Sequence, residues 1–262
     1  MRVAANLSML FSELELAQRS AAAAIAGFDG VEIQFPYELP ASVLAQQLNA
    51  INLPLVLINL PAGDLMAGGL GLACVSERQK DFNAALEQAL RYAEQAEPLK
   101  VNVLAGRLAQ ASNREAALAF LAGNVRRAAE AFAQLDIRVV VEAINPLDMP
   151  GFLINTPEHL NALLQQVDHP NLAAQLDLYH MARQGIDPLQ AIEQLAGRIG
   201  HVQFADYPGR GAPGSGSIDF SACAHALSAV GYHGWWAAEY RPGEAGTQAS
   251  LAWLESWRLA ER

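Results

Sequence analysis

Short apolar runs rich in β-branched residues alternate with longer alanine-rich stretches along the whole 262-residue chain. Each run is typical of a buried strand, and each stretch between two runs is typical of a helix. The expected strands are residues 2–6, 30–35, 53–59, 100–106, 137–145, 172–180, 199–206 and 235–240. Such regular alternation favours a parallel sheet covered by helices.

Helix signals support the same arrangement. Thr156 and Asp187, each followed by a proline, predict N-caps with proline in the first helical turn. No linker rich in Pro, Gly or Ser divides the chain, so we expect one domain over residues 1–262. Eight strand–helix units in about 250 residues predict a closed (β/α)8 TIM barrel, since an open doubly wound sheet would more often carry a Gly-rich turn after its first strand. The clearest expected helices are residues 77–94, 113–134, 156–166 and 188–196.

Charge and composition restrict the partners. The chain has 17 basic and 27 acidic residues, a net charge of −10, which would repel nucleic acid and acidic membrane surfaces. We therefore expect a small-molecule partner, no nucleic acid and no membrane. Cys74 and Cys223 cannot form a disulfide framework, and the apolar run at residues 3–11 is too short for a membrane span and lacks a cleavage signal. These features predict a cytoplasmic protein.

The last four expected strands each carry a polar residue near their ends: Glu142, Asp177, Gln203 and Glu239. The active site of such a barrel lies at the carboxyl ends of its strands. Because side chains alternate between the two faces of a strand, Val141 faces outward if Glu142 faces inward. Neighbouring strands lie about 4.8 Å apart, so the four polar side chains can converge on one point.

Three clustered carboxylates repel one another unless a cation lies between them. An all-oxygen set of three carboxylates and one amide suits a hard divalent ion, so the pattern predicts one Mg2+ or Mn2+. A single acid at a strand end is more often a helix cap or a surface ion pair, and the prediction therefore depends on the joint pattern. Gln175 and His201 are expected to point inward as hydrogen-bonded core groups.

Seven segments carry a family resemblance: AANLSMLF, GFDGVEIQFPY, NLPAGD, VVVEAINPLDMPGF, LDLYHMAR, HVQFADYPGRGAPGSGSIDF and GWWAAEYRP. They resemble the hydroxypyruvate isomerase family, within the xylose-isomerase-like TIM barrels, over essentially the whole chain. The resemblance implies a metal held at Glu142, Asp177, Gln203 and Glu239, with the two glutamates exchanging protons with the substrate. It also implies that His180 contacts substrate oxygens.

The implied reaction interconverts hydroxypyruvate and tartronate semialdehyde (2-hydroxy-3-oxopropanoate) through a cis-enediolate, so the expected partner is a small hydroxy-oxo acid. Asn59, in the NLPAGD segment, is a further candidate for substrate contact. Arg210 is the candidate for binding the substrate carboxylate, because its guanidinium offers a bidentate fork. The glycine-rich loop around Arg210 lacks the lysine of a phosphate-binding loop, and its composition predicts a mobile lid.

Two departures from the family pattern leave alternatives open. Leu70 stands where an arginine is usual, and Ile58 stands where histidine is common. The related 2-oxo-tetronate isomerases also lack that arginine, so a four-carbon sugar acid is an alternative substrate. Ketose epimerases and dehydratases on the same barrel, and a non-catalytic binding barrel, are further alternatives. Endonuclease action at abasic DNA is disfavoured by six histidines and the −10 charge, and a homo-oligomer is not excluded.

Overall fold

Eight parallel strands close into one barrel in the computed structural model, which describes residues 1–109 and 113–260. Neighbours in the chain are neighbours in the barrel, and β8 pairs with β1. The predicted (β/α)8 fold is thereby confirmed. The strands are β1 (Arg2–Asn6), β2 (Gly30–Ile33), β3 (Leu55–Asn59), β4 (Lys100–Asn102), β5 (Arg138–Glu142), β6 (Leu172–Asp177), β7 (Ile199–Phe204) and β8 (Trp235–Ala238).

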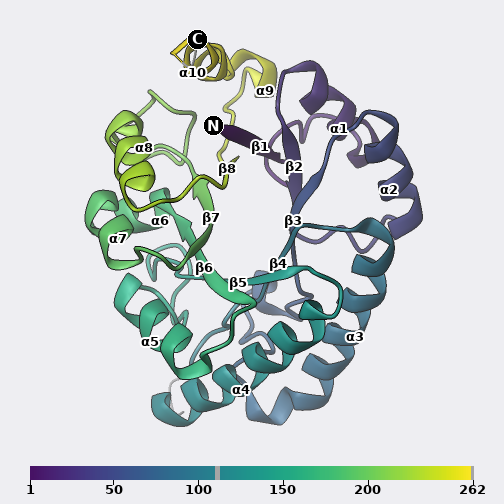
Figure 1. The fold of residues 1–262 in the computed structure, drawn as a ribbon, viewed down its shortest axis with the longest axis vertical. Coiled ribbons are helices and arrows are strands. Elements are labelled where there is room, and N and C mark those ends of the chain that lie inside the picture. The colour runs from purple at the N-terminus through teal and green to yellow at the C-terminus, as the bar shows by residue number, and fades with distance from the viewer. Residues whose placement is uncertain (110–112, 261–262) are drawn as a thin grey trace.

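Helices form a ring around the barrel, and both chain ends lie on the same side of that ring (Figure 1). Thr156 Oγ1 accepts from the backbone N–H of His159 at 3.2 Å, and Asp187 Oδ1 accepts from that of Leu189 at 2.9 Å, so both predicted N-caps are confirmed. The helices are α1 (Leu16–Ile25), α2 (Ala41–Ala50), α3 (Gln79–Ala96), α4 (Arg114–Ala133), α5 (Pro157–Val167), α6 (Leu178–Arg183), α7 (Pro188–Gln194), α8 (Phe220–Ala229), α9 (Gly246–Ala249) and α10 (Ala252–Ala260).

Six predicted strands, those at β2 and at β4 to β8, were too long at their carboxyl ends by two to four residues, and β4 and β6 show the reason. β4 ends at Asn102 rather than at residue 106, where Gly106 turns the chain with φ of 89°. β6 ends at Asp177 rather than at residue 180, because Asp177 caps α6 and places His180 in that helix. In both cases the residues beyond the strand stay buried, and burial alone does not distinguish a strand from a buried turn or helix.

The alternation of side chains along the strands separates two cores. Val141 and Phe204 pack in the large core that the helices share with the outer face of the barrel. Val140 belongs to a second cluster inside the barrel, so Glu142, two residues further on, also points inward. This inner cluster is made only of strand residues, namely Ala4, Val56, Leu57, Val140, Ala173, Trp235 and Ala237.

Two further observations bear on the sequence predictions. Cys74 and Cys223 are both free and buried, and burial raises the thiol pKa to about 11 for Cys74 and about 12 for Cys223. Within residues 1–109 and 113–260, no helix combines the length and the apolar character needed to cross a bilayer.

Candidate active site

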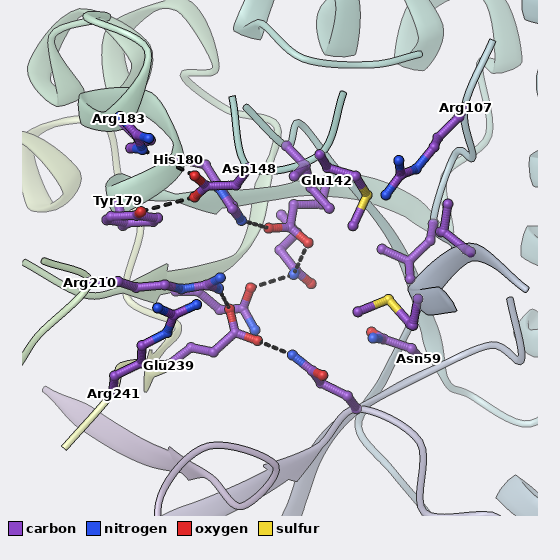
Figure 2. A pocket seen from close by; sticks show the side chains of 18 of the residues that line it. Asn59, Arg107, Glu142, Asp148, Tyr179, His180, Arg183, Arg210, Glu239 and Arg241 are labelled. Carbon is purple, nitrogen blue, oxygen red and sulfur yellow. Dashed lines mark hydrogen bonds and ion pairs between the residues drawn. The ribbon is translucent and has the colours of Figure 1, made fainter. Parts of the chain in front are cut away.

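A cavity of about 740 Å³ opens at the carboxyl ends of the strands, where the sequence predicted the site. Glu142, Gln203 and Glu239 line it, together with the three predicted substrate contacts Asn59, His180 and Arg210. Asp177 lies directly beneath, buried against His180. All seven predicted residues are therefore brought to one place, and Figure 2 shows the labelled members converging.

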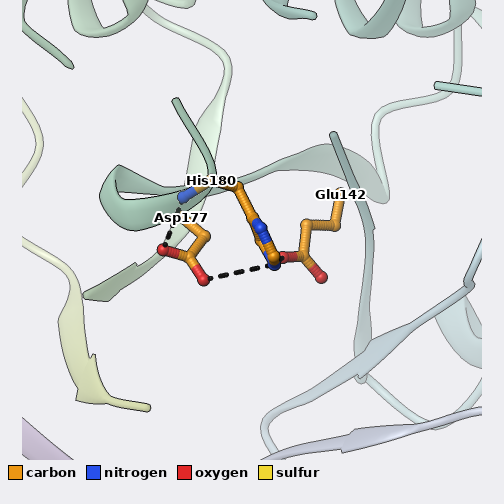
Figure 3. A group of neighbouring side chains, drawn as sticks. All are labelled: Glu142, Asp177 and His180. Atoms are coloured by element: carbon orange, nitrogen blue, oxygen red, sulfur yellow. Dashed lines mark hydrogen bonds and ion pairs between the residues drawn. The ribbon is translucent and has the colours of Figure 1, made fainter. Parts of the chain in front are cut away.

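Glu142, Asp177 and His180 form the tightest group of metal-ligating side chains among the described residues (Figure 3). One potential ligand atom from each lies within 4.8 Å of the other two. The imidazole Nε2 of His180 is 3.7 Å from Glu142 Oε1 and 3.7 Å from Asp177 Oδ2. These distances leave room for a small ion or a substrate oxygen between the three groups.

The two oxygens of Asp177 have different surroundings. Oδ1 caps α6 by accepting from the backbone N–H groups of Tyr179 at 2.8 Å and His180 at 3.4 Å. Oδ2 is buried and accepts no hydrogen bond. A buried carboxylate oxygen without a donor is costly, and a bound cation would satisfy it.

His180 is held as a neutral imidazole with a defined tautomer. Asn145 Oδ1 accepts from two backbone N–H groups, which turns the Asn145 amide so that its Nδ2 donates to His180 Nδ1 at 2.6 Å. Burial lowers the pKa of His180 to about 4, although Asp177 opposes the shift. The proton of the neutral ring is therefore on Nε2, so that this nitrogen can donate a hydrogen bond beside Glu142 and Asp177.

Glu239 immediately follows β8 and continues its hydrogen-bonded ladder, because its backbone N–H donates to Phe204 O at 3.0 Å. Both carboxylate oxygens are occupied. Oε1 accepts from Gln34 Nε2 at 2.6 Å and Asn6 Nδ2 at 3.1 Å, and Oε2 accepts from Arg210 Nη2 at 2.7 Å. The guanidinium of Arg210 is thus already paired with Glu239. Its Nη2 also lies 4.0 Å from Asp177 Oδ2.

A buried polar network extends from Gln203 into the barrel. Gln203 Nε2 donates to Glu32 Oε1 at 2.6 Å, and Gln203 Oε1 accepts from Gln175 Nε2 at 2.6 Å. The same Gln175 amide donates to Glu142 Oε2 at 2.9 Å, and His201 Nε2 lies 2.8 Å from Glu32 Oε2. Glu32 thereby fixes the Gln203 amide with its oxygen turned toward Gln175 and Glu142. Gln175 and His201 point inward as predicted.

The glycine-rich loop that carries Arg210 is folded around one buried aspartate. The side chain of Asp206 accepts from four backbone N–H groups, those of Tyr207, Gly214, Gly216 and Ile218, at 2.8 to 3.0 Å. At Gly216 a Cβ would lie 2.0 Å from the carbonyl oxygen of Tyr207, so only glycine fits there. These bonds hold Arg210 in place over the cavity.

The electrostatics of the carboxylates fit a cation. Burial, followed by the charges of Glu239 and Asp177, raises the pKa of Glu142 well above its ordinary value. Burial likewise raises the pKa of Glu239 to about 7, although Arg210 opposes the shift. A divalent ion would reverse both effects by favouring the ionised forms. Together with the unsatisfied Asp177 Oδ2, this shows that the residues present suit a hard divalent ion.

Sequence reasoning missed several residues of the site. Asn6 and Glu32 stand in β1 and β2 and obey the same rule as the four predicted residues, since each is a polar residue in an apolar run. Arg107 and Arg241 also line the cavity. Arg107 follows β4 by five residues, and no local pattern marks it as a site residue.

The two departures from the family pattern do not lie in the cavity. Ile58 is fully buried in the helix-facing core, and Leu70 lines a different cavity beside Cys74. Neither side chain therefore lines the candidate substrate cavity. The cavity is lined instead by the apolar side chains of Leu65 and Met66 and by the positively charged Arg107.

Comparison with known proteins identifies the family. The family model described as xylose isomerase-like TIM barrel matches residues 20–257. The chain is 38% identical to hydroxypyruvate isomerase of Escherichia coli, covering 98% of this chain and 100% of that one. It is 37% identical to 2-oxo-tetronate isomerase of Cupriavidus necator, covering 98% of each.

A solved structure extends the likeness to three dimensions. The protein described as AP endonuclease, family 2, from Brucella melitensis has a TM-score of 0.92 and 38% identity, with 98% of each chain covered. Sequence and fold agree, and the chain belongs to the hydroxypyruvate isomerase family of the xylose isomerase-like TIM barrels.

Proposed function

We propose that this isomerase interconverts hydroxypyruvate and tartronate semialdehyde with the help of one divalent ion, Mg2+ or Mn2+. The observation that carries the proposal is that Glu142 and Glu239 line one cavity and that Asp177 is buried beside it, with an oxygen that lacks a donor. The names of the E. coli and C. necator relatives supply the reaction class.

Glu142, Asp177, Gln203 and Glu239 would hold the ion. When bound, the ion would stabilise negative charge on the substrate oxygens as a proton leaves carbon. Gln203 is suited to this role because its Nε2 donates a hydrogen bond to Glu32. Its side-chain oxygen therefore faces Gln175 and Glu142.

Glu142 and Glu239 are proposed to move the proton. The reaction takes a proton from C3 of hydroxypyruvate and returns one to C2 through a cis-enediolate, so it needs a base and an acid within hydrogen-bond reach of these carbons. Asn59, His180 and Arg210 line the cavity and are proposed to contact the substrate, with the Nε2–H of His180 directed at one of its oxygens.

A four-carbon 2-oxo acid is the second candidate substrate. It is favoured by the 37% identity to 2-oxo-tetronate isomerase, nearly equal to the identity to hydroxypyruvate isomerase. Endonuclease action, which the printed description of the Brucella melitensis structure suggests, is disfavoured by the −10 charge of this chain and by the buried acidic site.

An NMR time course in heavy water tests the proposal. The protein is incubated with Mg2+ and, separately, hydroxypyruvate, a 2-oxo-tetronate and a ketose. We expect conversion of hydroxypyruvate, with deuterium at C2 of tartronate semialdehyde wherever the abstracted proton exchanges with solvent. Conversion of the ketose alone would contradict the proposal and indicate an epimerase or a sugar isomerase.

A further inference from the structure

The cavity carries positively charged side chains at two opposite walls. At one wall stand Arg183, Arg210 and Arg241, and at the opposite wall stands Arg107 (Figure 2). Between them lie the acidic groups of Glu142 and Glu239. The arginines at these walls are the positively charged side chains of the cavity that would attract the carboxylate of an anionic substrate.

Arg183 and Arg210 are already paired. Arg183 Nε donates to Asp148 Oδ1 at 3.1 Å, and Arg210 Nη2 donates to Glu239 Oε2 at 2.7 Å. A substrate carboxylate bound to Arg210 would compete with Glu239 and would lie beside two acidic side chains. Its net gain in free energy would be small, since one ion pair would only replace another.

Arg107 has no such partner. Within residues 1–109 and 113–260 it forms no ion pair, and its Nε is buried without a hydrogen-bond acceptor. Arg210 Nε also lacks an acceptor, but the Nη2 of the same guanidinium is paired with Glu239. Arg241 forms no ion pair among the described residues either, but it is exposed. Its backbone is fixed, because its N–H donates to Leu70 O at 2.9 Å and its carbonyl accepts from the Cys74 thiol at 3.5 Å. A buried donor without an acceptor is costly, and a carboxylate would satisfy it.

We infer that Arg107 binds the carboxylate of the hydroxy-oxo acid and thereby fixes which end of the substrate faces the acidic residues. The inference rests on the proposed function, which it deepens. The carboxylate would accept hydrogen bonds from the Arg107 guanidinium, and the carbonyl and hydroxymethyl end would face Glu142 and Glu239. Arg107 thus selects 2-oxo acids over neutral sugars of equal length, a role that the sequence had suggested for Arg210.

The test compares a charged ligand with a neutral one of the same carbon number. Hydroxypyruvate and dihydroxyacetone differ only in carrying a carboxylate or a hydroxymethyl group. The variants are Arg107→Gln, Arg107→Lys and Arg241→Gln, with the exposed Arg91→Gln as the control. The measured quantities are KM for hydroxypyruvate and Ki for dihydroxyacetone as a competitive inhibitor.

For Arg107→Gln we expect KM for hydroxypyruvate to rise by about 10- to 100-fold, the loss typical of a hydrogen bond to a charged group. Ki for dihydroxyacetone should stay within about threefold. In Arg107→Lys, KM for hydroxypyruvate should rise less, because lysine keeps the positive charge but cannot donate two parallel hydrogen bonds to a carboxylate. Equal losses for both ligands, unchanged KM, or a larger loss in Arg241→Gln would each overturn the inference.

Binding of D-glycerate, measured by calorimetry in the presence of Mg2+, separates this inference from the proposed function. D-glycerate carries the carboxylate but has no ketone to isomerise. If the wild-type protein turned over no 2-oxo acid, the proposed function would fail. Weaker glycerate binding in Arg107→Gln than in the Arg91→Gln control would still support the role of Arg107, and equal binding would overturn it.

Discussion

Glu32 offers a sharp test of the buried network beneath the site. Its side chain is fully buried and accepts from three groups, Asn6 Nδ2 at 2.8 Å, Gln203 Nε2 at 2.6 Å and His201 Nε2 at 2.8 Å. Glu32→Gln replaces one acceptor oxygen with an N–H group that faces another donor. His201 cannot resolve the conflict, because its second nitrogen faces the ammonium of Lys100 at 3.5 Å.

One buried donor therefore stays unpaired whichever way the new amide turns, which costs about 1–3 kcal/mol. Weakening of the other bonds brings the total to about 2–4 kcal/mol. For a chain of this size, each kcal/mol lowers the melting temperature by about 2–4 °C, so we expect a decrease of roughly 4–16 °C.

Thermal unfolding followed by circular dichroism measures the shift. The matched control is Glu87→Gln, in an exposed ion pair with Arg91 at 3.7 Å, which should change the stability by no more than about 0.5 kcal/mol. Manganese titration of the same variant should show weaker binding, because the Gln203 amide is then free to turn. Equal melting temperatures and equal manganese affinities in Glu32→Gln and the control would refute this account of the network.

Four other substitutions have distinct expected outcomes. Asp177→Asn should keep the α6 cap, and hence most of the stability, while removing the rise in melting temperature that Mn2+ gives the wild type; a preserved rise would contradict its role as a ligand. Asp206→Ala removes the acceptor of four backbone N–H groups in the loop, so it should lower kcat/KM at least about tenfold and speed trypsin cleavage after Arg210. An unchanged rate of cleavage would contradict the role of Asp206 in holding the loop. Glu142→Gln and Glu239→Gln should each lower kcat by about 10²- to 10⁴-fold, and near-wild-type turnover in both would remove them from proton transfer.

The fold and most of the site were predictable because the signals are local. Glu142, Asp177 and Gln203 each lie at or next to the end of an apolar strand. The geometry of a barrel brings these strand ends together independently of the conformation of the loops. The caps at Thr156 and Asp187 were predictable for the same reason, since a cap involves only residues two or three positions apart.

The partners of the arginines were not predictable. Whether Arg210 meets Glu239, and whether Arg107 meets any acid, depends on the paths of two loops in three dimensions. Ile58 shows the same limit, because its place beside Asn59 in the chain suggested the pocket, whereas strand alternation turns it toward the helices. Position along a strand predicts direction, but contacts between loops require the structure.

Dependence on a divalent ion is tested most directly by removing it. Wild-type protein is treated with a chelator, dialysed, and assayed with hydroxypyruvate before and after Mg2+ or Mn2+ is restored, with circular dichroism as a check on folding. We predict that turnover disappears on chelation and returns with the ion, while the barrel stays folded, because its stability comes from buried apolar surface. Turnover at the untreated rate in the chelated, dialysed protein would contradict the central claim.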